Sequence, residues 1–138
     1  MLRKLESFMK GKVHKLPPTA SVVEAARLMA GKGCASVVVS TKGRLEGIFT
    51  SGDLVKRVVA VSRSPARTRL GDVMTRQPDT VDAATLAIDA LRMMQAGHYR
   101  HLPVMDGQRI IGIVSRRDFF GQEEAIIEDG NRLSEVMR

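Results

Sequence analysis

The chain of 138 residues has no tryptophan, one tyrosine and one cysteine, and aromatic residues make up 4% of it. One cysteine excludes an internal disulfide, and a chain of this size can bury enough surface without one. No apolar run approaches the ~20 residues that span a bilayer, and the start, Met1–Lys4, lacks an apolar signal core. We therefore expect a cytoplasmic protein without membrane contact, built as one domain or as two closely packed halves.

Motifs for catalysis and metal binding are also missing. The histidines and the cysteine, which are His14, His98, His101 and Cys34, do not have the spacing of metal ligands. The sequence contains no phosphate loop of the Gly-Lys-Ser/Thr type and no supported Ser/His/Asp arrangement. We expect no enzyme activity, no catalytic cofactor and no metal.

Acidic residues are scarce in the first half of the chain. Residues 1–77 contain 15 Lys/Arg and 5 Asp/Glu, whereas residues 78–138 contain 7 and 10. A basic half can attract nucleic acid, acidic membranes or small polyanions. The shortage of aromatic residues and the lack of a nucleic-acid motif favour a solvated surface, paired with the acidic half of another copy. Nucleic-acid binding through the basic half remains the lesser alternative.

What the sequence does contain is an internal repeat. A shift of 65 positions aligns residues 13–54 with residues 78–119 without a gap, and it places Asp53 on Asp118. A repeat of this length implies two copies of one supersecondary unit, each too small to bury its own apolar face. We expect the copies to pack about a pseudo-two-fold axis, so that any crevice between them exists twice.

Each copy has the pattern β-α-β-β-α, which predicts an α/β fold with the two units packed sheet to sheet. The first copy predicts extended chain at 13–16, a helix capped by Ser21 and stopped by Gly31 and Gly33, strands at 36–40 and 44–50, and a helix from Ser51 or Gly52 to Val61. The second predicts extended chain at 80–81, a helix from Asp82 or Ala83 to Ala96, strands at 101–105 and 109–115, and a helix from Arg116 to about Ile127.

The pattern divides the chain into four segments. The first unit with its lead-in segment covers 1–62, and a basic linker with the second lead-in covers 63–77. The second unit covers 78–128, and a cap segment at 129–138 follows, in which 133–137 echoes 70–74.

Both copies place a hydroxyl residue at the junction of the last strand and last helix, with a carboxylate three positions later. The pairs are Thr50 with Asp53 and Ser115 with Asp118. Such a pair can cap a helix and favour its dipole. A helix N-terminus with a hydroxyl can also bind an anion, and a nearby carboxylate can accept hydrogen bonds from a ribose diol. The residues alone leave both roles open.

Two tandem units that share Gly-Ile-x-Thr/Ser-x-x-Asp resemble a pair of cystathionine-β-synthase (CBS) domains, known as a Bateman module. Arg100–Val104 resembles the family's entry into its central strand, and Leu70–Thr75 resembles its lead-in segment. The resemblance covers nearly the whole chain. It implies a regulatory module that binds an adenosine-containing ligand (AMP, ADP, ATP or NAD) between its units and signals to an unknown protein. It also implies a homodimer.

The resemblance further implies two unequal ligand clefts, in which carboxylates take ribose hydroxyls while hydroxyl and basic side chains take phosphate. The first cleft combines Thr50, Asp53, Thr80, Tyr99, Arg100, His101 and Pro103. The related cleft combines Ser115, Arg117, Asp118, Lys15, Cys34, Ala35 and Ser36. The first has the fuller polar set, so we expect it to be the preferred one.

A scaffold without a ligand is the main alternative. It would dimerise through helical faces that carry Val55, Val58 and Val59 together with Met93 and Met94.

Overall fold

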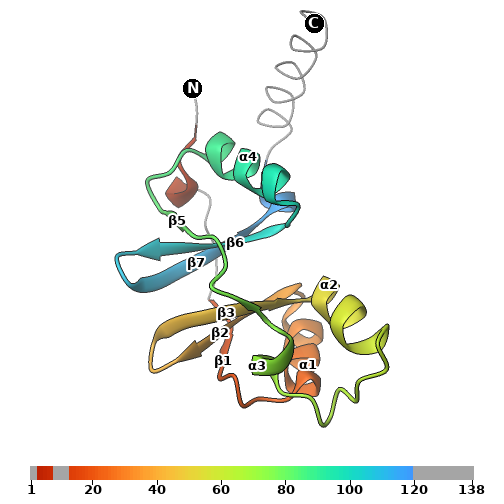
Figure 1. Ribbon diagram of the computed structural model, residues 1–138. Coiled ribbons are helices and arrows are strands. Elements are labelled where there is room, and N and C mark those ends of the chain that lie inside the picture. Colours follow the sequence, from red (N-terminus) through yellow and green to blue (C-terminus); the bar gives the residue numbers. More distant parts are fainter. Residues whose placement is uncertain (1–2, 8–12, 120–138) are drawn as a thin grey trace, which may run out of the picture.

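The computed structural model describes residues 3–7 and 13–119, and these form two α/β units that face each other across a seam (Figure 1). The first unit contains β1 (Lys15–Leu16), α1 (Val22–Lys32), β2 (Ser36–Thr41), β3 (Arg44–Thr50), α2 (Ser51–Asp53) and the π-helical turn η2 (Leu54–Val59). The second contains β5 (Val81–Asp82), α4 (Ala87–Gly97), β6 (His101–Asp106), β7 (Arg109–Ser115) and the 3-10 turn η3 (Arg116–Asp118). The α/β class and the paired units are thus confirmed.

Two lead-in segments complete the structure. In the chain, the short 3-10 turn η1 (Leu5–Ser7) precedes the first unit. Helix α3 (Leu70–Val73) and strand β4 (Thr75–Arg76) follow the first unit and precede the second. The sheets have the strand orders β1-β2-β3-β4 and β5-β6-β7, with β1 and β5 each parallel to its neighbour. Strands β3 and β7 contact each other across the seam. No helix in the described part of the chain has the length and apolar character needed to cross a membrane.

Helix α1 shows how local sequence sets the element bounds. The Ser21 side chain accepts a hydrogen bond from the Glu24 N–H at 3.1 Å, so the helix begins at Val22. Gly33 ends it in the left-handed region with φ of 64°, where glycine carries no steric penalty. The start at Ser21 and the stop at Gly33 agree with the prediction from the sequence, whereas Gly31, also predicted as a stop, lies within the helix.

The predicted start of α4 at Asp82 or Ala83 is wrong. Asp82 forms a turn, because its Oδ1 accepts from the Ala84 N–H at 2.7 Å and its carbonyl accepts from the Thr85 N–H at 3.0 Å. The helix begins only at Ala87. The repeat itself contained this information, since Ala87 aligns with Val22, the first residue of α1.

The last helix of each unit also departs from the prediction. In the first unit it ends at Val59 instead of Val61, and most of it is π-helical. In the second, Arg116–Asp118 is helical and the last described residue, Phe119, is extended with φ of −84° and ψ of 142°. The remainder of that predicted helix, like the predicted cap segment, lies outside the described residues.

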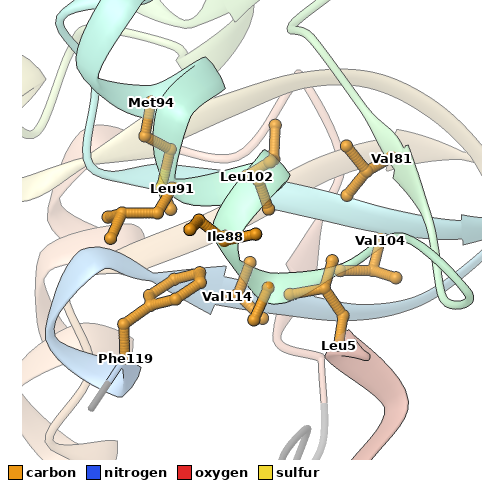
Figure 2. Packing of buried hydrophobic residues seen from close by; sticks show 11 residues of the cluster. Leu5, Val81, Ile88, Leu91, Met94, Leu102, Val104, Val114 and Phe119 are labelled. Carbon is orange, nitrogen blue, oxygen red and sulfur yellow. The ribbon is translucent and has the colours of Figure 1, made fainter. Parts of the chain in front are cut away.

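Each sheet packs one face against its helices, and the other face meets the seam. In the first unit, Val37, Val39 and Phe49 are buried beneath α1. Val38 and Ile48, which alternate with them along the strands, are also buried, at 1% and 5% exposure, but belong to the opposite face. The second core is built alike around Leu91, Leu102 and Val104, as Figure 2 shows. Sheet-to-sheet packing therefore buries both faces of each hairpin.

The lead-in segments are exchanged between the units. Leu70, which follows the first unit, is fully buried in the first core, whereas Leu5, which precedes that unit, is fully buried in the second core (Figure 2). The Leu70 N–H donates to the Ala20 carbonyl at 2.9 Å, and the Leu5 N–H donates to the Thr85 carbonyl at 3.0 Å. These bonds are equivalent under the 65-residue shift. Each core is therefore completed by the lead-in segment of the other unit.

Gly47 marks the closest approach of the second lead-in to the first sheet. It pairs with Arg76 where β4 joins β3, and a Cβ atom there would lie 2.6 Å from both Met74 Sδ and the Thr75 carbonyl oxygen. The Met74 side chain can move, but the Thr75 oxygen belongs to the paired backbone. This position therefore requires glycine.

We expect Gly47→Ala to lower the free energy of unfolding by about 1–3 kcal/mol, since β4 must shift to admit the methyl group. Gly31→Ala is the matched control, because nothing lies within 4 Å of its Cβ position and it sits within a helix. That control should stabilise the protein by up to about 1 kcal/mol. Urea denaturation measures both, and equal stability of the two variants would contradict this account of β4.

Candidate ligand-binding clefts

A cavity of about 640 Å³ lies at the seam, beside the junction of β3 and α2. Residues of both units line it. From the first unit come Ile48, Thr50, Ser51, Gly52, Asp53, Lys56 and Arg57. From the segment between the units and the second unit come Thr75, Pro78, Asp79, Gly97, His98, Tyr99, Arg100 and His101. We call this cavity the large cleft.

A smaller cavity of about 230 Å³ is its counterpart under the repeat. Ile113, Ser115 and Asp118 stand where the large cleft has Ile48, Thr50 and Asp53. On the opposite side of each cleft, the aligned residues differ more in chemistry. The small cleft has His14, Cys34, Ala35 and Ser36 at the positions of Asp79, Tyr99, Arg100 and His101. We call this cavity the small cleft.

The structure brings most of the predicted site residues together. Thr50, Asp53, Tyr99, Arg100 and His101 line the large cleft. The small cleft is lined by Ser115, Arg117, Asp118, Cys34, Ala35 and Ser36.

Three predicted residues do not line either cleft. Lys15 and Thr80, which are equivalent under the repeat, are both exposed. Their neighbours His14 and Asp79 line the clefts instead, because successive side chains of an extended segment point to opposite sides. Pro103 is buried within β6. The alignment of the two copies could not show which of two neighbouring residues faces the cleft, because it pairs His14 with Asp79 and Lys15 with Thr80 equally well.

Thr50 and Asp53 form a reciprocal capping box at the rim of the large cleft. The Thr50 N–H donates to Asp53 Oδ2 at 2.9 Å, and the Asp53 N–H donates to Thr50 Oγ1 at 3.2 Å. The second carboxylate oxygen, Oδ1, lies 3.6 Å from Arg57 Nε. Capping thus occupies one oxygen of Asp53 and leaves the other directed at a solvent-accessible arginine.

The second unit keeps this arrangement in part. The Ser115 N–H donates to Asp118 Oδ2 at 2.7 Å. Ser115 Oγ faces the Asp118 N–H as in a capping box, but this contact falls short of hydrogen-bond geometry. The buried Ser115 hydroxyl therefore has no hydrogen-bond partner within the described ranges.

Arg57 and Lys56 are cleft residues that the sequence reasoning missed. Arg57 Nη1 donates to the carbonyl oxygens of Val73 at 3.3 Å and Met74 at 3.0 Å, so it ties the η2 turn to the second lead-in. The available signal was helical spacing, because residues three and four positions after Asp53 share its helix face. The carbonyl partners of Arg57 at Val73 and Met74 could come only from the tertiary fold.

Tyr99 closes one side of the large cleft with Asp79. The Tyr99 O–H donates to Asp79 Oδ2 at 2.7 Å. Burial, this hydrogen bond and the charge of Asp79 raise the pKa of Tyr99 to about 12. The phenol therefore stays protonated at neutral pH, and it holds an acidic side chain in the cleft.

His101 lies between the two clefts and lines both. Burial lowers the pKa of its imidazole below the ordinary 6.5, and Arg117 and Arg100 act in the same direction, against Asp118 and Asp53. At neutral pH the side chain is neutral, and it can donate one hydrogen bond and accept another. Among the described residues, no group of three or more His, Cys, Asp or Glu side chains is placed to hold a metal ion.

The chain matches known proteins over both units. Residues 5–60 and 70–122 each match the family described as the CBS domain. The chain is 39% identical over 95 residues to the Arabidopsis thaliana CBS domain-containing protein CBSCBSPB1, which covers 69% of this chain and 18% of that protein. It is 32% identical over 127 residues to an arabinose 5-phosphate isomerase of Francisella tularensis, covering 89% and 38%. The chain thus spans less than two fifths of these curated relatives.

Solved structures share the fold. A putative signal-transduction protein with CBS domains from Burkholderia ambifaria superposes with a TM-score of 0.80 at 29% identity, covering 84% of this chain and 90% of that one. A CBS domain protein of Pyrobaculum aerophilum in complex with AMP gives a TM-score of 0.78 at 22% identity, covering 84% and 89%. At that identity the second likeness concerns the fold alone.

The pKa of His101 gives a test of the geometry at the seam. We expect an NMR titration of its imidazole to give a pKa below 6.5, and Arg117→Gln should raise it by removing a nearby positive charge. Arg109→Gln, at the distant start of β7, should leave it unchanged.

The same shift has a consequence for stability. Because the unfolded chain takes up the His101 proton more readily, the free energy of unfolding should fall as pH drops below about 6.5, and His101→Gln should remove that part of the decrease. An imidazole that titrates at or above 6.5 would show that His101 is not enclosed as described.

Proposed function

The chain belongs to the CBS domain family as a tandem pair, and from this we propose that it is a regulatory module that binds an adenosine-containing nucleotide in its large cleft. AMP, ADP, ATP and NAD are the candidate ligands. The observation that carries the proposal is the Asp53 carboxylate, which lies at the rim of a cavity of about 640 Å³ with one oxygen available beyond its capping bond. The Pyrobaculum aerophilum protein, which shares the fold, is itself complexed with AMP.

The size of the clefts favours occupancy of one site. Small-molecule pockets usually measure about 300–1,000 Å³. The large cleft, at about 640 Å³, falls within this range, whereas the small cleft, at about 230 Å³, falls below it. The side chains agree, because Cys34 and Ala35 provide fewer polar groups than Tyr99 and Arg100. We propose that the large cleft is the ligand site.

The lining of the large cleft suits the three parts of a nucleotide. Asp53 Oδ1 can accept hydrogen bonds from the ribose hydroxyls. Lys56, Arg57 and Arg100 can pair with phosphate. The apolar surface of Ile48, Pro78 and the Tyr99 ring can contact the base. We propose binding without a chemical step, although the Francisella relative shows that proteins with similar segments include enzymes.

Calorimetric titration with AMP, ATP and NAD tests the proposal. We expect binding of at least one of them, weakened about tenfold or more by Asp53→Asn, because a neutral amide accepts the ribose hydrogen bonds less strongly. The amide oxygen can still accept the Thr50 N–H, so the capping bond is retained.

Asp118→Asn is the matched control, since it makes the same change in the small cleft. It should alter affinity by less than about twofold. No heat and no thermal shift with any adenosine compound would overturn the proposed function. Equal losses in both variants would overturn only the choice of cleft.

We further propose that Arg57 passes occupancy of the cleft to the rest of the molecule. Its guanidinium contacts both Asp53 and the carbonyl groups of Val73 and Met74, which end α3 just before β4. A ribose bound at Asp53 Oδ1 competes for the carboxylate that Arg57 now faces. Ligand can bias the protein only through such differential contacts. The second lead-in is then the segment that responds.

Hydrogen exchange of residues 73–76 tests this coupling. We expect the ligand to change their exchange rates in the wild type, and Arg57→Lys to abolish that change while reducing affinity by less than about threefold, because lysine keeps the charge but lacks the planar fork. Arg63→Lys, in the exposed linker, is the matched control. A ligand response that persists in Arg57→Lys would contradict the role of Arg57.

A scaffold that acts by self-association is the second candidate. Val55 and Val59 lie one helical turn apart and are 60% and 61% exposed, which favours contact with another chain. The exposed apolar face is smaller than the sequence predicted, because Val58 and Met94 are buried in the two cores. A homodimer remains a prediction. Wild-type function that survives Asp53→Asn with no measurable ligand binding would favour the scaffold.

A further inference from the structure

Each unit has one site, at the start of its first helix, that holds a lead-in segment. We call these sites the first seat and the second seat. In the first seat, the Val22 N–H donates to the Thr68 carbonyl at 2.9 Å. The Leu70 N–H donates to the Ala20 carbonyl at 2.9 Å, and the Leu70 side chain is buried in the first core.

The second seat repeats these contacts with the N-terminal lead-in. The Ala87 N–H donates to the Arg3 carbonyl at 2.7 Å, and the Leu5 N–H donates to the Thr85 carbonyl at 3.0 Å. The Leu5 side chain is buried in the second core (Figure 2). Because both hydrogen bonds follow from those of the first seat by the 65-residue shift, the two seats bind the same backbone pattern and the same leucine.

The sequence contains a third segment with this pattern. Residues 4–9 read Lys-Leu-Glu-Ser-Phe-Met, and residues 69–74 read Arg-Leu-Gly-Asp-Val-Met. Residues 132–137 read Arg-Leu-Ser-Glu-Val-Met. All three place a leucine directly after a basic residue and a methionine four positions after the leucine. The chain therefore has three segments of the kind that the two seats of its described part bind.

The order of the chain assigns the third segment to the second seat. In the first unit, the segment that follows the unit fills that unit's own seat, and Leu70 comes 17 residues after Asp53. Leu133 comes 15 residues after Asp118, the counterpart of Asp53 under the repeat. A connection of nearly the same length can therefore bring Leu133 to the second seat, which Leu5 occupies in the structure.

We propose that residues 132–137 compete with the N-terminal lead-in for the second seat. In the alternative state, the Leu133 side chain replaces that of Leu5 in the second core. The Ala87 N–H then donates to the carbonyl of Asn131, which stands in the third segment where Arg3 stands in the first. The inference does not depend on the proposed nucleotide ligand.

The competition acts on the small cleft, because the N-terminal lead-in is followed by a residue of its wall. His14 lines the small cleft, just as Asp79, which follows Leu70, lines the large cleft. When Leu133 takes the second seat, the chain before His14 loses its anchor at Leu5. The chain before Asp79 keeps its anchor at Leu70. The occupant of the second seat thus regulates one cleft and leaves the other unchanged.

Amide hydrogen exchange followed by NMR tests the inference in the wild type. The Leu5 N–H is protected only when its own segment is seated, whereas the Ala87 N–H has a carbonyl partner with either occupant. An excess of a peptide of residues 130–138 should therefore lower the protection of Leu5 about tenfold or more and change that of Ala87 by less than about twofold. The same peptide with Leu133→Ala should have no effect.

Variants of the full chain test the same competition without a peptide. Leu5→Ala should lower the protection of the Ala87 N–H by less than about threefold, because residues 132–137 take the seat. Leu5→Ala combined with Leu133→Ala should lower it about tenfold or more, because neither segment then supplies a leucine to the core. The protection of Ala25, in the first core, shows whether each variant is folded.

The first seat is the matched control, since one segment serves it. Leu70→Ala should lower the protection of the Val22 N–H about tenfold or more, whether or not Leu133 is replaced.

The inference is overturned if Leu5→Ala alone costs Ala87 the full tenfold and the peptide leaves Leu5 protected. It is also overturned if retention of Ala87 protection in Leu5→Ala requires high protein concentration, because the segment in the seat then comes from a second copy. The proposed nucleotide site stands in either case.

Discussion

The exchange of lead-in segments holds the two units in a fixed relation. The Leu70 N–H bonds to the Ala20 carbonyl, the Leu5 N–H bonds to the Thr85 carbonyl, and both leucines are fully buried. Each core therefore takes a side chain from a segment outside its own unit. Burial of a leucine contributes roughly 1.5–3 kcal/mol of stability. Separating the units would therefore destabilise both cores. The seam and its cavities are thus set by the same contacts that stabilise the fold.

On this symmetric framework, the two clefts have diverged. The Ser51 N–H bonds to the Ala35 carbonyl at 3.0 Å, and its counterpart, the Arg116 N–H, bonds to the Arg100 carbonyl at 2.8 Å. The backbone is thus repeated at the seam while the side chains differ. Arg100 in place of Ala35 adds a positive charge to the large cleft, whereas Arg117 lines the small cleft. The repeat therefore provides the backbone geometry twice, with a different set of side chains in each cleft.

At Asp53 a structural role coincides with the proposed ligand contact. One carboxylate oxygen closes the capping box with Thr50, and the other faces Arg57, which in turn holds the carbonyl groups before β4. Capping orients the side chain, so Oδ1 needs no further ordering to exchange Arg57 for a ligand. A single residue therefore links helix stability, the proposed ribose contact and the path to the second lead-in.

The sequence by itself determined the repeat, the α/β class, the element order and the hydroxyl–carboxylate junctions, because these depend on local spacing and on alignment of the chain with itself. Helix α1 and its caps followed from Ser21 and Gly33 alone. Where a side chain competes with the helix, as Asp82 does, the predicted bounds failed by several residues.

Only the tertiary structure decided which unit each lead-in segment joins, which cleft is large enough for a ligand, and which side chains face it. Asp79 lines the large cleft and Thr80 does not, and Arg57 finds its carbonyl partners 16 and 17 residues away. These features depend on contacts between segments that are distant in the chain. Local pattern cannot specify them, because they arise only when the two units pack against each other.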